Sequence, residues 1–96
     1  MTDSHAKIDT RPTTVDVPTY AQNRGLPRLW PNDYALKVTM HEDYVSITGN
    51  AEGLQGLAVQ LLALAAEDVP PGYGHDLLAD GIELDVGSVP LSIFRH

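Results

Sequence analysis

Histidine and carboxylate side chains are the groups of this 96-residue chain that could bind a metal ion or transfer a proton. His41 precedes Glu42 and Asp43, and His75 precedes Asp76. Neighbouring residues on a strand point to opposite faces, so these pairs do not converge on one ion. No histidine pair has the i, i+4 spacing of a helical zinc site, and the chain contains no cysteine to supply a thiolate. We therefore expect neither a metal site nor a cofactor.

Nucleophilic catalysis also lacks a motif. Ser46, Ser88 and Ser92 stand outside any Gly-x-Ser-x-Gly elbow, and none has a base-bearing motif beside it. The short run Gly72-Tyr73-Gly74 follows an expected helix, whereas a phosphate-binding loop would open one. We therefore expect the protein not to be an enzyme.

The most informative chemical feature is an acidic segment near the end of the chain. Asp76, Asp80, Glu83 and Asp85 place four carboxylates within ten residues, with no lysine or arginine between them. Such a surface speeds encounter with a basic partner and sets specificity more than it adds affinity. Together with the neighbouring His75, these residues are our candidate partner-binding site; the alternative is a solvated face that keeps the protein soluble.

The formal net charge of −7 is unevenly distributed. Residues 1–33 carry four basic and four acidic side chains, whereas residues 34–96 carry two basic and nine acidic ones. Excess acid disfavours binding to phosphate backbones, so we expect no nucleic-acid partner. No apolar run approaches the roughly 20 residues of a membrane span. The start lacks the apolar region of a secretory signal, which predicts a cytoplasmic protein without membrane association.

The first 33 residues show no helical or strand period, and they predict a flexible N-terminal arm. They are polar and are interrupted by four prolines, so they bury too little apolar surface to offset the entropy of ordering. Leu26, Leu29 and Trp30 are the exception. These three large apolar side chains dock either onto the body of the protein or onto a partner.

The remaining residues, 34–96, predict a single domain. Apolar residues alternate with polar ones over 34–40 and again over 44–48, which indicates an antiparallel hairpin. Asn50 then has the chemistry of a helix N-cap. The helix that follows has an apolar stripe that we expect to face the core: Leu54, Leu57, Ala58, Leu61, Leu62, Leu64 and Ala65. Pro70-Pro71-Gly72 excludes its continuation.

Two further strands are expected after the helix, at residues 75–79 and 89–94, while residues 82–88 form either a strand or a loop. Pro90 cannot donate a ladder hydrogen bond, so the last strand lies at an edge or pairs only beyond it. The predicted fold is α+β in ββαββ order, a small antiparallel sheet with one helix packed on one face. The opposite face is solvated or meets a partner, and it carries Tyr44, Ser46, Thr48, Ser92 and Phe94.

Residues 45–54 (VSITGNAEGL), together with Leu57-Ala58 and residues 61–65 (LLALA), resemble the centre of the small immunity proteins of bacterial polymorphic-toxin systems, family thirty-two of that series. His75, Gly87-Ser88 and the alternating residues 89–94 fall where this family has a histidine-containing strand, a Gly-Ser step and a closing strand. The resemblance covers residues 34–96.

This resemblance implies a non-catalytic protein that binds a cognate toxin domain and blocks it. A toxin that acts as a nuclease would carry basic groups for the phosphate backbone, and the acidic segment would meet those groups. The alternative is a small structural or regulatory domain that forms a homodimer through its open sheet face, near Tyr44, Ser46, Ser92 and Pro90.

Overall fold

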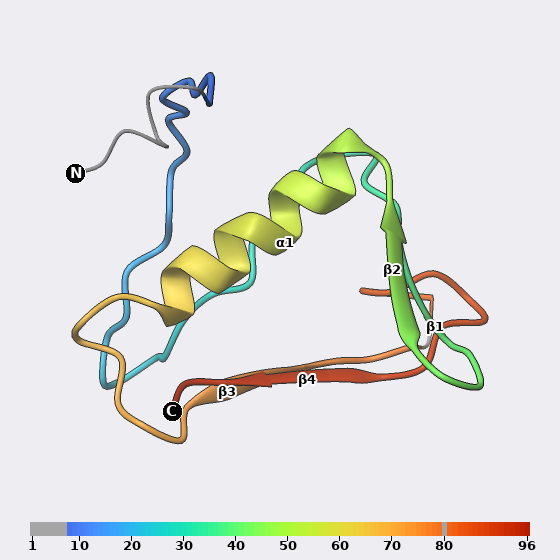
Figure 1. The fold of residues 1–96 in the computed structure, drawn as a ribbon. Helices are drawn as coiled ribbons and strands as arrows, with labels where there is room; N and C mark the ends of the chain where they lie inside the picture. Colours follow the sequence, from blue (N-terminus) through green and yellow to red (C-terminus); the bar gives the residue numbers. More distant parts are fainter. Residues whose placement is uncertain (1–7, 80) are drawn as a thin grey trace.

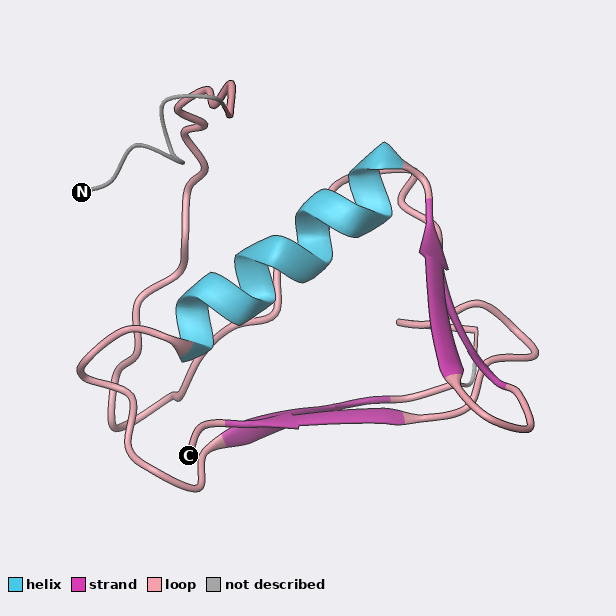
Figure 2. Cartoon of the chain, viewed as in Figure 1, coloured by secondary structure: helices cyan, strands magenta, loops and turns pink. Residues whose placement is uncertain are grey.

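A computed structural model of the protein describes residues 8–79 and 81–96. It contains, in chain order, β1 (Leu36–Met40), β2 (Val45–Gly49), α1 (Ala51–Leu64), β3 (Gly74–Leu77) and β4 (Leu91–Phe94). The fold is therefore α+β. In Figure 1 the helix and the two strand pairs lie along three sides of a triangle. Asn50 alone separates β2 from α1, whereas Figure 2 shows long loops between α1 and β3 and between β3 and β4.

The strands form two separate two-stranded antiparallel sheets and not the single sheet predicted from the sequence. β1 pairs with β2, with Val38 opposite Ile47, and β3 pairs with β4, with His75 opposite Ile93. The last strand begins after Pro90 and pairs with β3 alone, so both alternatives given for it hold: it lies at a sheet edge, and it pairs only beyond the proline.

The loop between β3 and β4 explains why the sheets stay apart. Its Asp85 and Val89 N–H groups donate to the carbonyl oxygens of Leu36 and Val38, both at 2.8 Å, and the Ser88 hydroxyl accepts from the N–H of Val38. This loop therefore occupies the edge of β1 that another strand would need. The segment 82–88 consists of turns and bends, so it is a loop.

The start of α1 agrees with the predicted cap. The side-chain oxygen of Asn50 accepts from the N–H of Gly53 at 2.7 Å and from that of Ala35 at 2.9 Å, while its amide group donates to the carbonyl of Asp33. The cap thereby satisfies a free N–H of the first helical turn. It also fixes residues 33–35 against the helix.

The end of α1 receives a cation from the far end of the chain. The guanidinium of Arg95 donates to the carbonyl oxygens of Leu64 and Ala66, at 3.0 and 2.8 Å. Positive charge is favourable at the negative end of a helix, where the last carbonyls lack partners within it. Arg95 follows β4 directly, so this contact joins the second sheet to the helix.

The buried face of α1 differs from the predicted one. Its buried residues are Gly53, Gly56, Gln60, Ala63 and Leu64. The apolar stripe is largely exposed, apart from Leu64 and the half-buried Leu57: Leu54, Leu61 and Leu62 are 48%, 45% and 50% exposed, and Ala58 and Ala65 are exposed as well. The prediction that the leucines face the core was therefore wrong for most of the stripe.

The two glycines explain this orientation. A Cβ atom on Gly53 would overlap the carbonyl oxygen of Ala35, and one on Gly56 would lie 2.5 Å from the Trp30 ring. The chain at residues 30–35 thus approaches the helix as closely as only glycine permits. Because this segment packs on the glycine face, the leucines of α1 turn away from it.

Two clusters of buried residues form the core. The first contains Leu26, Ala63, Leu64 and Val69, and the second Leu36, Val38, Leu77 and Leu84; Ile93 packs against both. Leu26 belongs to the segment predicted as an arm, and Trp30 packs against the second cluster, whereas Leu29 is exposed. Leu26 and Trp30 therefore dock onto the body.

Candidate protein-binding surface

Glu83 is the centre of the acidic segment in the folded chain. Its carboxylate oxygen Oε2 lies 2.9 Å from Nε of Arg28 and accepts a 3.2 Å hydrogen bond from the indole N–H of Trp30. The side chain is only 13% exposed. The acidic segment has no lysine or arginine of its own, but Arg28, from a distant part of the sequence, pairs with Glu83.

An aromatic pair extends this cluster. The ring of Tyr34 stacks on that of Trp30, with centroids 4.6 Å apart, and its hydroxyl donates to the Glu83 carbonyl oxygen at 2.7 Å. Burial, followed by the charges of Glu83 and Asp85, raises the pKa of Tyr34. The phenol is therefore a neutral hydrogen-bond donor at physiological pH.

A shallow pocket of about 530 Å³ adjoins these groups. Its lining consists of Arg28, Trp30, Tyr34, Leu78, Ile82 and Glu83. Since Arg28 neutralises Glu83, the pocket presents an aromatic wall beside a closed ion pair. The two charged residues that line the pocket, Arg28 and Glu83, therefore form an ion pair with each other.

His75 lies inside the protein, with 4% of its surface exposed. The ring of Tyr73 meets it edge-on, with centroids 5.7 Å apart, and its Nε2 atom has no hydrogen-bond partner. Burial lowers the pKa of His75, and the charge of Arg28 lowers it further, whereas Glu83 acts in the opposite direction. His75 is therefore a neutral buried residue and not an exposed contact.

Asp76 and Asp85 are exposed. The Asp76 carboxylate accepts a 2.6 Å hydrogen bond from the Ser92 hydroxyl, and its backbone carbonyl accepts from Arg28 at 3.3 Å. Asp80 lies outside the described residues. Arg28 therefore contacts the Glu83 carboxylate and the backbone of Asp76, but it does not pair with the Asp76 carboxylate. Asp85 is near enough for its charge to act on Tyr34, and His75 is internal.

One arrangement with the form of a nucleophile and base was not predicted. Nε2 of His41 lies 2.9 Å from the hydroxyl oxygen of Ser46, and the His41 ring stacks on Tyr44 at 4.3 Å. A catalytic pair of this kind needs a third group that orients the imidazole and donors that stabilise an oxyanion. Both side chains are on the surface of the β1–β2 hairpin, where the contact ties one strand to the turn.

Residues 8–79 and 81–96 contain no group of three or more histidine or carboxylate side chains that could hold a metal ion. Nor do they contain a helix of the length and apolar character that crossing a membrane requires.

Sequence reasoning missed Arg28 and Tyr34 as members of the cluster. The only signal was the apolar group around them, Leu26, Leu29 and Trp30, which stood out in a polar segment. This apolar group indicated that the segment docks, but it did not indicate which residues it docks onto. Trp30 and Glu83 are 53 residues apart in the sequence, so no local pattern connects them.

Comparison with protein families gives one finding. The family described as Immunity protein 32 matches residues 44–96, more than half of the chain, from the start of β2 to the C-terminus. Comparisons with curated proteins and with solved structures find no match. The family match confirms the resemblance noted in the sequence, and it includes α1 and the acidic segment.

Proposed function

The chain belongs to the immunity protein 32 family, and from this premise we propose that it binds a cognate bacterial toxin domain and blocks it without catalysis. The family match over residues 44–96 is the observation that carries this proposal. Binding alone suffices to neutralise a toxin if it covers or distorts the active site. The toxin supplies the reaction, and this chain supplies a complementary surface.

We place the electrostatic part of that surface in the acidic segment. Asp76 and Asp85 are exposed, so their carboxylates are accessible to a basic partner. Asp80 lies between them in the sequence and joins them in this proposal. Glu83 and His75 contribute from inside: Glu83 holds residues 28–34 against the segment, and His75 fills the interior behind Asp76. A nuclease, with its basic substrate-binding groups, is the kind of toxin that this charge fits.

The test is co-expression with the toxin domain encoded beside this chain. We expect the wild-type protein to restore growth and to co-purify with the toxin. Absence of both would disprove the proposed function. The acidic surface is tested by Asp76→Lys combined with Asp85→Lys.

The double variant should associate about 10- to 100-fold more slowly at low salt, with a weaker salt dependence. Glu42→Lys combined with Asp43→Lys is the matched control, because it makes the same change of charge in the exposed β1–β2 turn. Equal association rates for the two double variants would show that the acidic segment is not the contact.

A further inference from the structure

The outer edge of β2 is open in the described part of the chain. A bond from the Asn50 N–H to the Ala35 carbonyl sets the phase of the β1–β2 ladder. Because hydrogen-bonded pairs alternate in an antiparallel ladder, every second residue of β2 turns its N–H and C=O groups away from β1. These residues are Val45, Ile47 and Gly49. No hydrogen bond within the described residues reaches their outward backbone groups.

The edges of the other strands are covered or interrupted. The loop between β3 and β4 bonds the outward groups of β1. On β3 the Asp76 carbonyl accepts from Arg28, and Pro90 directly precedes β4. Proteins protect exposed strand edges by such means, and also by charged side chains on the edge strand. β2 contains neither a proline nor a charged residue, so its edge is able to pair with another strand.

The side chains of β2 also fit the addition of a strand. Ile47 lies opposite Val38 in the ladder and therefore shares its face of the hairpin. Val38 is fully buried, whereas Val45 and Ile47 are 53% and 43% exposed. The apolar layer that begins with the second core cluster thus ends uncovered at β2. An added strand would cover this layer and bond the outward backbone groups at the same time.

The position of the acidic segment argues against the toxin as the owner of that strand. The Asp85 N–H donates to the Leu36 carbonyl, so the segment that we place against the toxin follows β1, at the opposite edge of the hairpin. The edge of β2 carries no charge that would select a basic partner. Its occupant must instead offer an uncharged strand with apolar and hydroxyl side chains on alternate faces.

β2 itself meets this requirement. In an antiparallel pair of β2 strands with the two-fold axis at Ile47, Ile47 meets its own equivalent and Val45 of each copy meets Gly49 of the other. All of these residues point outward, so each pair can exchange its backbone hydrogen bonds. Gly49 leaves room for the valine side chain. On the other face, Ser46 of one copy lies opposite Thr48 of the other, and such hydroxyl pairs are favourable.

We propose that the chain forms a two-fold dimer through the edge of β2, with a four-stranded antiparallel sheet in the order β1-β2-β2-β1. The contact is the strand edge and not the open sheet face considered for the sequence. Each copy has one such edge, so the assembly closes at two chains. The nearest like charges are Glu42 and Asp43 of one copy and Glu52 of the other. All three are exposed and lie outside the paired strands, so salt screens their repulsion. Both acidic segments stay free for the toxin.

The experiment is sedimentation velocity on the full chain over about 5 to 500 μM. A single strand pair is a small interface, so we expect a dissociation constant of about 10 to 100 μM. Ile47→Lys and Ile47→Glu should each weaken the dimer at least about tenfold, because this side chain meets its equivalent at the two-fold axis and like charges repel there. An equimolar mixture of the two variants should dimerise again, because opposite charges then meet.

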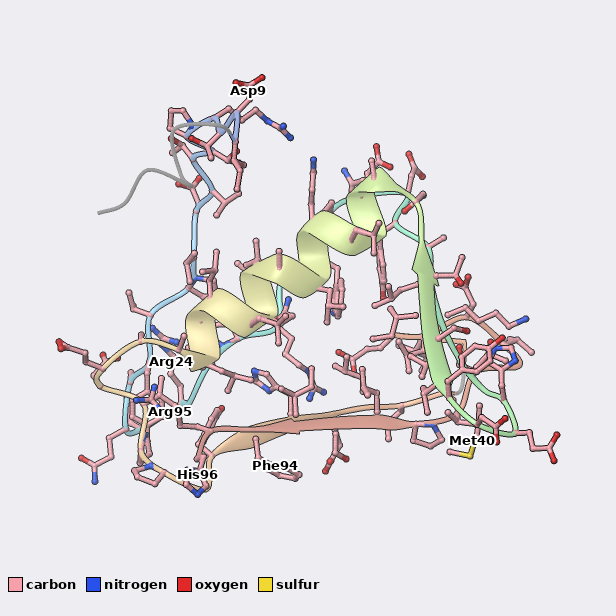
Figure 3. All side chains as sticks on the ribbon, viewed as in Figure 1. Asp9, Arg24, Met40, Phe94, Arg95 and His96 are labelled. Atoms are coloured by element: carbon pink, nitrogen blue, oxygen red, sulfur yellow. The ribbon has the colours of Figure 1, made fainter. Side chains whose placement is uncertain are left out.

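Phe94→Lys is the matched control. It makes the same change at a residue that is 62% exposed and lies on the other sheet, away from the β1–β2 hairpin (Figure 3). The control should dimerise within about threefold of the wild type. Circular dichroism checks that each variant keeps its fold, which we expect because Ile47 is half exposed.

Hydrogen exchange of the wild type tests the same contact without a substitution. The amides of Val45, Ile47 and Gly49 should become protected as the concentration rises, because only the dimer bonds them. The amides of Ser46 and Thr48 face β1 and should be protected at every concentration.

The outcomes separate a second copy from the toxin. A wild type that stays monomeric at about 500 μM, or a dimer that neither variant of Ile47 weakens, would overturn this inference. Restored association in the mixture identifies a second copy as the occupant. If the wild type is monomeric and Ile47→Lys abolishes binding of the toxin, a strand of the toxin occupies the edge and the dimer is disproved. Loss of the dimer leaves the proposed function intact, because co-expression tests that function separately.

Discussion

The two faces of α1 make contact with their surroundings by opposite means. On the inner face, Gly53 and Gly56 let backbone and indole groups approach the helix axis, and Gln60 is fully buried, with its amide group donating to the Leu29 carbonyl. On the outer face, Leu54, Leu61 and Leu62 stay about half exposed, whereas Leu64 on the inner side is buried. Burial of a residue in this helix therefore depends on the side it faces and not on the size of its side chain.

The largest change in stability is expected when one methyl group is added to the inner face of α1. Gly53→Ala should lower the free energy of unfolding by about 3 kcal/mol, because its Cβ meets the backbone of Ala35, which cannot move aside without breaking the Asn50 cap. The better helix propensity of alanine offsets only about 1 kcal/mol. Urea denaturation measures the change, and the exposed Gln55→Ala, expected within about 0.5 kcal/mol of wild type, is the control. Equal stabilities would contradict the close approach.

A second test concerns the buried polar groups on the inner side. His75 has a lowered pKa, so near pH 6 the unfolded chain binds a proton that the folded chain does not. Stability should therefore fall as the pH drops below about 6.5, by up to about 1.4 kcal/mol per pH unit, until the folded-state pKa is reached. Above pH 7 both states are neutral at this residue, and the dependence disappears.

Urea titrations at pH 7.5, 6.5 and 5.5 measure this slope. His75→Leu should flatten it, whereas His41→Gln, which removes an exposed histidine, should leave it in place. A slope that survives His75→Leu would assign the proton uptake to another group. The charged groups that act on His75 are Arg28 and Glu83, so both variants should retain that ion pair.

The smallest effect is expected on the outer face. Leu62→Gln should change the free energy of unfolding by no more than about 0.5 kcal/mol, because the leucine is half exposed and belongs to neither core cluster. The same denaturation assay applies. A loss of about 2 kcal/mol would mean that the outer face of α1 packs within its own chain, and it would remove the contrast between the two faces.

Local features of the fold were predictable from the sequence. The turn at residues 41–43, the Asn50 cap and the pairing beyond Pro90 each depend on a few neighbouring residues whose chemistry permits little else. The orientation of α1 was not predicted, because a stripe of leucines identifies an apolar face without saying what lies against it. Gly53 and Gly56, at i, i+3 spacing within a helix, were the available signal, since glycine there costs helix stability unless something approaches closely.

The candidate surface was predictable only in part. The acidic segment could be located by composition, but the pairing of Glu83 with Arg28 and the burial of His75 depend on how distant segments meet. The boundary at residue 33 remains a prediction, although Leu26 and Trp30 pack against the body that was expected to begin after it. Sequence patterns describe charge along the chain, whereas accessibility of that charge follows from tertiary packing.

The link between residues 26–34 and the end of the chain has a consequence for how the molecule folds. The Leu26 N–H donates to the hydroxyl of Tyr73, and the Trp30 indole donates to Glu83, across 47 and 53 residues. Contacts of such long sequence separation slow folding, because a large loop must close before they form. The contacts of residues 29–35 with the start and middle of α1 span much shorter separations, so they can form before residues 73–83 are in place. The link from Leu26 and Trp30 to Tyr73 and Glu83 is therefore expected to close after the helix has already gained its covered face.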